Sequence, residues 1–431
     1  MASDAVGAGS DAGYQRGEDR RNYLLVTAGY WTDTLVDGAT RTLVLFYFDR
    51  LGYTPLQVAS LFVLYEVAGV VTNLVGGWLA ARLGLKITLF MGLAIQVLAL
   101  AMLGLAPASL LVVPYVMCSQ ALSGVAKDLN KMSSKSAVRL VVGEGDQSSL
   151  YRWVAILTGS KNALKGIGFF LGGLLLTLFG FRAALLALAA LVLVALVLSS
   201  TMIRGHLGRP DSSAKFTQMF SNNRAVNILA AARVFLFSAR DVWFVVALPF
   251  FLYAELGWTF WQVGTLLAVW VIGYGAVQAA APRLVRRRAG AEPDGRTAVW
   301  LALALALCPA AIAAALDAHV DPTVSILVGL VPFGAVFAMN SAVHSYLILA
   351  YADNDKVAMN VGFYYTANAL GRLAGTVLSG VIYEWQGLTA CLWTASGFVV
   401  ATALLSLLLP REPPPSPVAA GHTIEALVTS S

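Results

Sequence analysis

The sequence predicts an all-α membrane protein in which twelve transmembrane helices form two six-helix bundles related by a pseudo-two-fold axis. Three observations lead to this fold class. The chain is 58% hydrophobic and only 12% charged, roughly half the charged fraction of a typical soluble protein. Apolar runs of about twenty residues recur along its whole length. A short motif also occurs once in each half of the chain.

Each apolar run is long enough to cross the ~30 Å hydrocarbon core of a bilayer as a helix. The runs lack the ~10-residue, period-two pattern of strands in a membrane barrel. We therefore expect transmembrane helices at residues 22–47, 57–81, 86–106, 110–130, 152–178, 182–203, 225–252, 260–281, 297–317, 323–350, 358–383 and 387–409.

The repeated motif predicts a duplicated six-helix unit. LGYTPLQVASL at 51–61 and LGWTFWQVGTL at 256–266 are identical at six of eleven positions, and each follows the first predicted helix of its half. Chance similarity is the alternative. We expect an N-terminal bundle at 22–203, a polar cytoplasmic linker at 204–223 and a C-terminal bundle at 224–410. The ends, 1–21 and 411–431, are expected to be disordered cytoplasmic tails.

Lys and Arg residues set the expected orientation, because cytoplasmic loops of membrane proteins carry the excess of both. Of the 29 Lys and Arg residues, six lie well inside predicted helices, and two, Arg50 and Arg182, lie in loops or at a helix end expected outside. The others are cytoplasmic if the N-terminus is cytoplasmic, so we expect both termini inside. Basic loops facing anionic lipid explain the isoelectric point near 9.2 without a nucleic-acid partner.

Cations inside predicted helices are the main functional signal. Each costs roughly 2.5–3.5 kcal/mol at a helix centre that faces lipid, so we expect them to face a polar cavity or to pair with acids. The cations are Arg41, Lys161, Lys165, Arg233, Arg240 and Arg372, and the acids within helices are Asp33, Asp37, Glu66 and Asp241.

Lys161 and Lys165 share one helical stripe with Gly168 and Gly172. Lys165 lies ~16 Å along its predicted helix, near the bilayer midplane where transporters bind substrate. We expect both lysines to contact an anionic substrate. A structural ion pair with an aspartate of another helix is the alternative.

Arginine forks match phosphate-like oxyanions, so arginines of the second half are expected to complete a site shared by both bundles. The Tyr365 hydroxyl is a further candidate donor, with ordinary packing as its alternative. The candidate substrate-binding residues are Arg41, Lys161, Lys165, Arg233, Arg240, Tyr365, Asn368 and Arg372.

Three carboxyl groups are candidate proton-coupling residues, Asp33, Asp37 and Glu66, because a carboxyl group away from water can hold a proton at neutral pH. Asp37 and Arg41 can pair within one helix, which would leave Asp33 free. For Glu66 the alternatives are a hydrogen bond to a hydroxyl or an arginine partner.

Lys127, Lys131, Lys135 and Arg139 recur every four residues, and we expect this stripe to continue the fourth helix into the cytoplasm. Contact with lipid headgroups is one interpretation. The functional alternative is a funnel that collects anions, with Lys127 and Lys131 as its candidates.

Several function classes lack support. There is no GxxxxGK[ST] sequence for nucleotide binding, and the three cysteines, Cys118, Cys308 and Cys391, lie in different helices without metal-ligand spacing. His344 is the one histidine in a predicted helix, and no nucleophile–base pair accompanies it. We expect neither enzymatic activity nor a metal or cofactor.

The 6 + 6 duplication resembles the major facilitator superfamily. GWLAARLGLK at 77–86 resembles its G-x-x-x-D-R-x-G-R-K loop, with Ala81 at the acidic position and Leu85 at a basic one, which puts the charge relay of that loop in doubt. GFFLGG at 168–173 resembles its G-P-x-x-G-G antiporter motif, with Phe169 replacing proline, so a weaker kink is expected.

Four segments of the sequence are more specific: RNYLLVTAGYWTDTLVDGATRTLVLFYF, NLVGGWLAARLGLKITLF, QALSGVAKDLNKMSSKSAV and LTGSKNALKGIGFFLGG. Together they resemble the organoarsenical efflux permease family, a bacterial branch of that superfamily, over roughly residues 20–410. The resemblance implies an inner-membrane permease for 1-arseno-3-phosphoglycerate, with glyceraldehyde-3-phosphate dehydrogenase as functional partner. We expect a monomeric secondary exporter with proton coupling that confers arsenate resistance. An organophosphate or organic-anion antiporter is the alternative.

Overall fold

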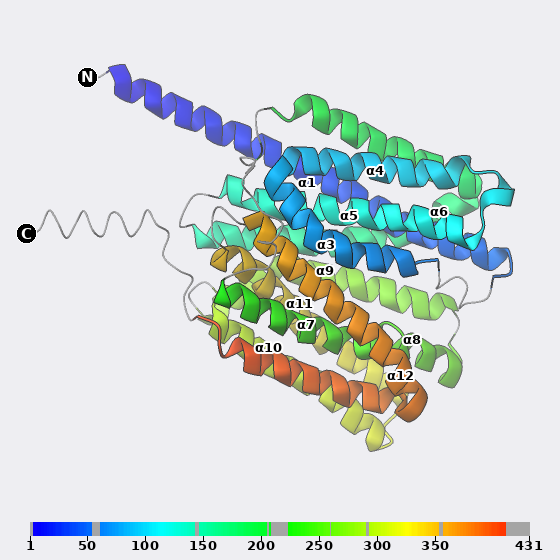
Figure 1. Ribbon diagram of the computed structural model, residues 1–431. Coiled ribbons are helices and arrows are strands. Elements are labelled where there is room, and N and C mark those ends of the chain that lie inside the picture. Colours follow the sequence, from blue (N-terminus) through cyan, green and yellow to red (C-terminus); the bar gives the residue numbers. More distant parts are fainter. Residues whose placement is uncertain are drawn as a thin grey trace, which may run out of the picture.

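The computed structural model describes residues 3–53, 61–142, 146–204, 207, 223–258, 260–289, 293–352 and 357–410. Within these residues the regular structure is helical throughout, and the long helices lie side by side along one common direction (Figure 1). The fold class predicted from the sequence is therefore confirmed.

The first half of the chain forms helices whose breaks fall at glycines or short loops. Gly84 separates two of them at φ 85°, a left-handed conformation that glycine adopts without a steric penalty. Gly180, at φ 71°, joins two transmembrane arms of one long helix. The elements are α1 (Ser3–Arg50), α3 (Val63–Leu83), α4 (Leu85–Leu105), η1 (Ala108–Leu110), α5 (Val113–Val141) and α6 (Gln147–Met202).

The second half repeats this plan, with Gly387 at φ 74° joining the two arms of its last helix. Its first span begins as an α-helix and ends in a short α-helix and a π-helical turn. The elements are α7 (Arg224–Phe244), α8 (Ala247–Phe250), η3 (Phe251–Glu255), α9 (Phe260–Ala289), α10 (Gly295–Asp317), α11 (Pro322–Tyr351) and α12 (Val357–Ser406).

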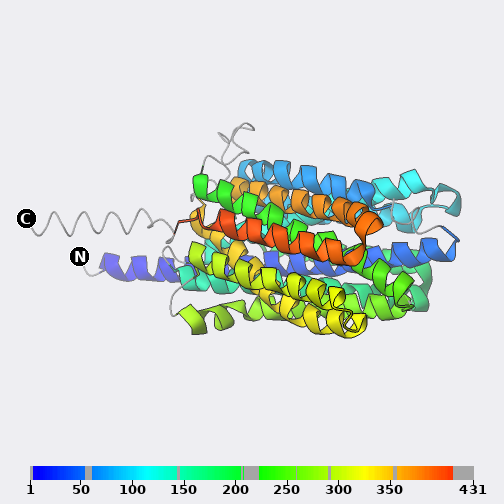
Figure 2. The ribbon, with the colours of Figure 1, turned by 90° about the horizontal axis from the view of Figure 1, so that it is seen from below.

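Eight helical segments among the described residues are long and apolar enough to cross a membrane. Two of them, α6 and α12, contain two arms each. Helices α1 and α5 fall outside this group although they run alongside the others (Figures 1 and 2). Both carry several charged side chains, which a membrane helix tolerates where it faces protein or a polar space rather than lipid.

Two helices extend beyond their predicted bounds. Helix α1 begins at Ser3, whereas its predicted start was residue 22. No proline interrupts this segment, and extending a helix that is already nucleated costs little. Helix α5 continues to Val141 instead of ending near residue 130. Three expected features lie outside the described residues: the tail at 411–431, most of the linker, and residues 54–60 of the repeat segment at 51–61.

Glycines bring the helices that carry the site into close contact. A Cβ atom at Gly168 or Gly172 would collide with the backbone of α1, and one at Gly159 would collide with the backbone of α9. A Cβ at Gly362 of α12 would meet the backbone of Gly77 in α3. The first two contacts hold α6 against α1 and fix the faces on which their charged residues meet.

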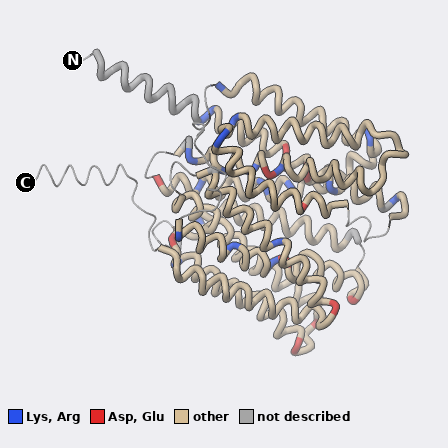
Figure 3. The backbone as a smooth tube through the Cα atoms, in the orientation of Figure 1, with Lys and Arg blue, Asp and Glu red and all other residues tan. Residues whose placement is uncertain are grey.

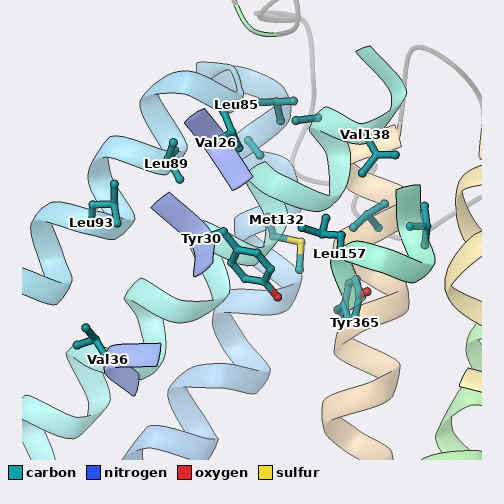
Figure 4. Close-up of a cluster of buried hydrophobic side chains, with 14 of the residues drawn as sticks. Val26, Tyr30, Val36, Leu85, Leu89, Leu93, Met132, Val138, Leu157 and Tyr365 are labelled. Atoms are coloured by element: carbon teal, nitrogen blue, oxygen red, sulfur yellow. The ribbon is translucent and has the colours of Figure 1, made fainter. Parts of the chain in front are cut away.

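The two halves meet firmly on the side where α1 begins and α12 ends, which we call the terminal side (Figures 1 and 2). The Tyr346 hydroxyl of α11 donates to Gln147 Oε1 of α6 at 3.1 Å, and Arg139 of α5 donates to the carbonyls of Leu349 and Ala352. One cluster of buried side chains also crosses the halves. Figure 4 shows its members Tyr30, Met132 and Leu157 of the first half with Tyr365 of the second.

Candidate substrate-binding site

Lysines, arginines and acids gather midway along the helices, where the two halves face each other (Figure 3). They fall into two groups at different depths. The outer cluster comprises Arg41, Asp37, Glu66, Lys165, Arg240, Asp241 and Arg372. The inner cluster lies nearer the terminal side and comprises Asp128, Lys131, Lys135, Lys161 and Arg233.

Ion pairs connect the outer cluster within the N-terminal half. Lys165 Nζ of α6 lies 3.3 Å from Asp37 Oδ2 of α1, and the Tyr65 hydroxyl donates to Asp37 Oδ1 at 2.6 Å. Arg41 Nη2 lies 3.1 Å from Glu66 Oε1 of α3. Asp37 and Arg41 therefore take partners on other helices, rather than each other as one interpretation of their spacing allowed.

The outer cluster continues into the C-terminal half through Glu66. Arg372 Nη2 of α12 lies 3.5 Å from Glu66 Oε1, so this carboxylate is shared by arginines of both halves. Arg372 Nε also lies 3.5 Å from Asp241 Oδ2, and Arg240 Nε lies 2.5 Å from Asp241 Oδ1. Each cation of this cluster thus has a carboxylate partner.

The inner cluster has a different composition. Lys131 Nζ donates to Asp128 Oδ1 at 2.6 Å and to the Asn73 side chain, and it lies 4.5 Å from the centre of the Tyr365 ring. Lys135 donates to the Thr158 hydroxyl.

Arg233 of α7 belongs to the same cluster and bonds within its own half. Its Nε donates to Asn368 Oδ1 at 3.0 Å, and its Nη1 donates to the Ser341 carbonyl at 3.3 Å. Its guanidinium also lies 5.0 Å from the centre of the Tyr364 ring. Lys161 has no hydrogen-bond or ion-pair partner among the residues that the structure describes.

The lysine stripe of α5 is packed against neighbouring helices. Lys131 and Lys135 are buried, and Lys127 lies 3.9 Å from the centre of the Tyr65 ring, near Asp37 and Glu66. Polar helices are tolerated where they face other helices instead of lipid. Lys127 and Lys131 therefore lie beside the charged clusters, and their role in a funnel stays a prediction.

Solvent exposure differs between the clusters. The side chains of Glu66 and Arg372 are 38% and 37% exposed, although their ion pair joins the two halves. In the inner cluster, Lys135 and Arg233 are each 3% exposed. Solvent thus reaches Glu66 and Arg372 of the outer cluster, whereas Lys135 and Arg233 of the inner cluster are shielded from it.

The three candidate proton-coupling residues have different surroundings. Asp37 and Glu66 are ion-paired as described. Asp33 is fully buried, and among the described residues it has no cation within ion-pair distance and interacts with the Asn130 side chain. A buried carboxyl group without a cation partner is least costly in its uncharged, protonated form. Asp33 therefore has the surroundings expected of a proton carrier.

Sequence reasoning missed part of the site. Asp128, Asn73 and Tyr65 each contact a charged residue of a cluster. The spacing of Asp128 and Lys131, three residues apart, was a usable signal because such residues neighbour each other on a helix. No sequence pattern pointed to Asn73 or Tyr65. Among the described residues, no group of three or more His, Cys, Asp or Glu side chains could hold a metal ion.

Comparison with known families supports the fold. The family model described as Major Facilitator Superfamily matches residues 26–347 and 234–428. The chain belongs to the major facilitator superfamily. It is a multi-pass membrane protein of a family of small-solute transporters.

Solved structures of this superfamily have the same fold as the chain at low sequence identity. The human organic anion transporter MFSD10 (TETRAN) has a TM-score of 0.69 and 16% identity, covering 90% of this chain and 99% of its own. A bacterial homologue of the iron transporter ferroportin in an outward-facing state has a TM-score of 0.69 and 13% identity, covering 90% and 98%.

A third such structure is the proton:xylose symporter XylE bound to 6-bromo-6-deoxy-D-glucose. It has a TM-score of 0.66 and 13% identity, covering 91% of this chain and 97% of its own. A comparison with curated proteins gave no match. The major facilitator fold is thus well supported, while identities this low say nothing about the substrate.

Proposed function

We propose that this protein is a secondary exporter of an organic oxyanion that works by alternating access. The observation that carries this proposal is the excess of cations over carboxylates where the two halves meet. The cations are Arg41, Lys127, Lys131, Lys135, Lys161, Lys165, Arg233, Arg240 and Arg372, and the acids are Asp33, Asp37, Glu66, Asp128 and Asp241. Such an excess between bundles favours a multiply charged anion.

The substrate that fits the sequence resemblance is 1-arseno-3-phosphoglycerate, the arsenate ester of 3-phosphoglycerate. Its phosphate and arsenate groups are pentavalent oxyanions, which arginine and lysine bind through charge-assisted hydrogen bonds. Trivalent arsenic would call for thiolates instead. Cys118, Cys308 and Cys391 lie on α5, α10 and α12 as free thiols.

Substrate binding would exchange one set of ion pairs for another. Glu66 neutralises Arg41 and Arg372, and an oxyanion between the halves would replace this carboxylate. Because those arginines belong to different halves, the exchange changes the contacts that hold the halves together. This coupling of binding to domain movement is what alternating access requires.

Proton exchange is proposed to drive export through Asp33. Asp33 is completely buried without a cation partner, which supports this choice over Asp37 and Glu66. Those two carboxylates already form ion pairs with cations of the outer cluster. We place the protein in the bacterial inner membrane with both termini cytoplasmic. In that orientation the terminal side, where the two halves meet, is the cytoplasmic side.

The alternative is an antiporter that exchanges an organophosphate or another organic anion for phosphate. The same cationic clusters suit it, and the structurally similar MFSD10 is named an organic anion transporter. Counterflow separates the two. Vesicles loaded with unlabelled phosphate accumulate labelled phosphate if the protein is such an antiporter, and do not if it exports the ester in exchange for protons.

Arsenate resistance tests the specific substrate. Sensitive cells would express this chain with or without glyceraldehyde-3-phosphate dehydrogenase, the proposed functional partner, which forms the ester when it uses arsenate in place of phosphate. We expect resistance only when both proteins are present. Resistance that does not require the dehydrogenase would contradict the ester as substrate and favour free arsenate.

A further inference from the structure

Three cations of the inner cluster lack a counter-ion. Among the described residues, Lys135, Lys161 and Arg233 have no carboxylate within ion-pair distance, unlike the cations of the outer cluster. Lys135 and Arg233 have only neutral hydrogen-bond acceptors, and Lys161 has no acceptor at all. Lys135 and Arg233 are buried, and buried positive charge without a counter-ion is costly, so this group is incomplete without an anion.

Contacts link these cations in a chain. Lys135 of α5 donates to Thr158, which lies three residues before Lys161 on α6. Lys135 is also an electrostatic neighbour of Arg233, and Lys161 is one of Lys131 and Lys135 as well as of Lys165 and Arg372 in the outer cluster. The three cations come from α5, α6 and α7, so both halves of the protein contribute. An anion placed among them would remove repulsion between the halves as well as the cost of each isolated charge.

Two buried polar side chains next to Arg233 also lack partners. Asn340 and His344 of α11 are fully buried, and neither the amide atoms of Asn340 nor the ring nitrogens of His344 have a hydrogen-bond partner among the described residues. They lie one turn apart and so share a face of the helix. His344 interacts electrostatically with Arg233, whose guanidinium donates to the carbonyl of Ser341 between them.

Buried polar groups are rarely left unpaired, and each such group calls for an explanation. The Asn340 amide and a His344 ring N–H are hydrogen-bond donors that a bound oxyanion could use. Their position beside an uncompensated arginine is what a closed anion site needs: charge from one direction and neutral donors from another.

We propose that Lys135, Lys161 and Arg233 form a second anion subsite, distinct from the outer cluster, that binds one tetrahedral oxyanion such as phosphate, arsenate or a phosphoryl group. This inference rests on the proposed function, because it takes the transported solute to be an oxyanion. In the present conformation Lys135 and Arg233 are shut off from solvent, and Lys161 is partly exposed. The subsite becomes accessible when the terminal side opens, so it is the site where the anion first binds.

The two subsites suit a substrate with an oxyanion at each end. Arg233 and Arg240 lie on the same helix, seven residues and therefore roughly 10 Å apart along its axis. Carboxylates compete for the cations of the outer cluster, but no acid competes for these three cations of the inner cluster. Binding is thus expected to be tighter at the inner subsite, and release is expected to be easier at the outer one.

Titration calorimetry with inorganic phosphate tests the inner subsite on the full-length protein in nanodiscs. Lys161→Gln is the main variant, because Lys161 has no partner whose loss would disturb the fold. Lys135→Gln and Arg233→Gln extend the test to the other two cations. Arg296→Gln, at an exposed position on α10, removes a cation elsewhere and serves as the control.

We expect phosphate to bind at least tenfold more weakly to Lys161→Gln and to Arg233→Gln than to the wild type, with no change in Arg296→Gln. Unchanged affinity in all three inner-cluster variants, each monodisperse and with a wild-type melting temperature, would overturn the subsite. Uptake of the ester by vesicles containing those variants would then leave the proposed function intact. Weakened phosphate binding with no anion transport by the wild type would instead support the subsite and contradict the proposed function.

Discussion

Glu66 of α3 and Arg372 of α12 form an ion pair of 3.5 Å that joins the two halves of the protein midway along the helices. The same carboxylate oxygen of Glu66 also lies 3.1 Å from Arg41. A single acid therefore neutralises one arginine from each half. Any anion that takes its place must contact both halves at once.

Replacing Glu66 by glutamine should raise anion affinity and slow transport. The amide keeps the size of the side chain but leaves Arg41 and Arg372 without a negative partner, so a substrate oxyanion meets no competitor. We expect the KM of transport to fall several-fold and the maximal rate to fall at least tenfold. Initial rates in proteoliposomes give both values. An increase in KM would show that Glu66 assists binding instead of competing with it.

Lys165→Ala should abolish transport while the protein still folds. The substitution removes the cation that neutralises Asp37 and contributes to the outer cluster. Lys165→Arg keeps the charge and should retain a measurable fraction of the activity. Size-exclusion chromatography shows whether each variant folds. Full transport by Lys165→Ala would remove this lysine from the site.

Asp33→Asn should separate exchange from proton-driven transport. The amide resembles a permanently protonated carboxyl group, so the variant can still bind substrate but cannot release a proton. We expect counterflow of the anion to continue while accumulation driven by a pH gradient disappears. Both assays use the same proteoliposomes. If the pH gradient still drives accumulation in Asp33→Asn, another group carries the proton.

Gly168→Val should destabilise the packing of α6 against α1. A Cβ at this position would collide with the carbonyl oxygen of Leu35 and with Cα of Gly38, and neither backbone atom can move aside easily. Overpacking of this kind typically costs about 1–3 kcal/mol. Gly173→Ala is the matched control, because its Cβ would lie at an ordinary 3.8 Å from the Phe46 side chain. Thermal unfolding in nanodiscs should show a lower midpoint for Gly168→Val alone.

A cross-link between positions 147 and 346 should lock the terminal side shut. The Tyr346 hydroxyl donates to Gln147 across the two halves at 3.1 Å, so a reducible bifunctional thiol reagent that spans two long side chains can join cysteines at these positions. We expect cross-linking of the double variant Gln147→Cys, Tyr346→Cys to stop transport and reduction of the cross-link to restore it. Each single variant treated with the same reagent serves as the control. Transport that continues in the cross-linked protein would show that this contact stays closed throughout the cycle.

The sequence was sufficient to predict the class of fold and that charged residues within the helices would face one another in the interior of the bundle. Apolar run lengths place helices, and the cost of charge in lipid requires Lys165 and Arg372 to face the interior. The partner of each charge was not predictable. Lys165 meets Asp37 because glycines such as Gly168 let α6 approach α1 on one particular face, and that rotation depends on tertiary packing.

The polar part of α5 shows the other limit of sequence reasoning. Lys131 and Lys135 look like the start of a cytoplasmic loop when each helix is judged by its own hydropathy. A helix surrounded by other helices does not contact lipid, so it can carry lysines as long as its neighbours supply partners such as Asn73 and Thr158. Those partners lie far away in the chain, and their positions depend on the assembled bundle.

Uptake of 1-arseno-3-phosphoglycerate by everted membrane vesicles tests the central claim most directly. Everted vesicles present the cytoplasmic face to the medium, so an exporter moves its substrate inward. We predict saturable accumulation of the ester in vesicles that contain the wild-type protein, and none in vesicles that contain Arg372→Gln. Equal accumulation by both, or none above vesicles without the protein, would contradict the account.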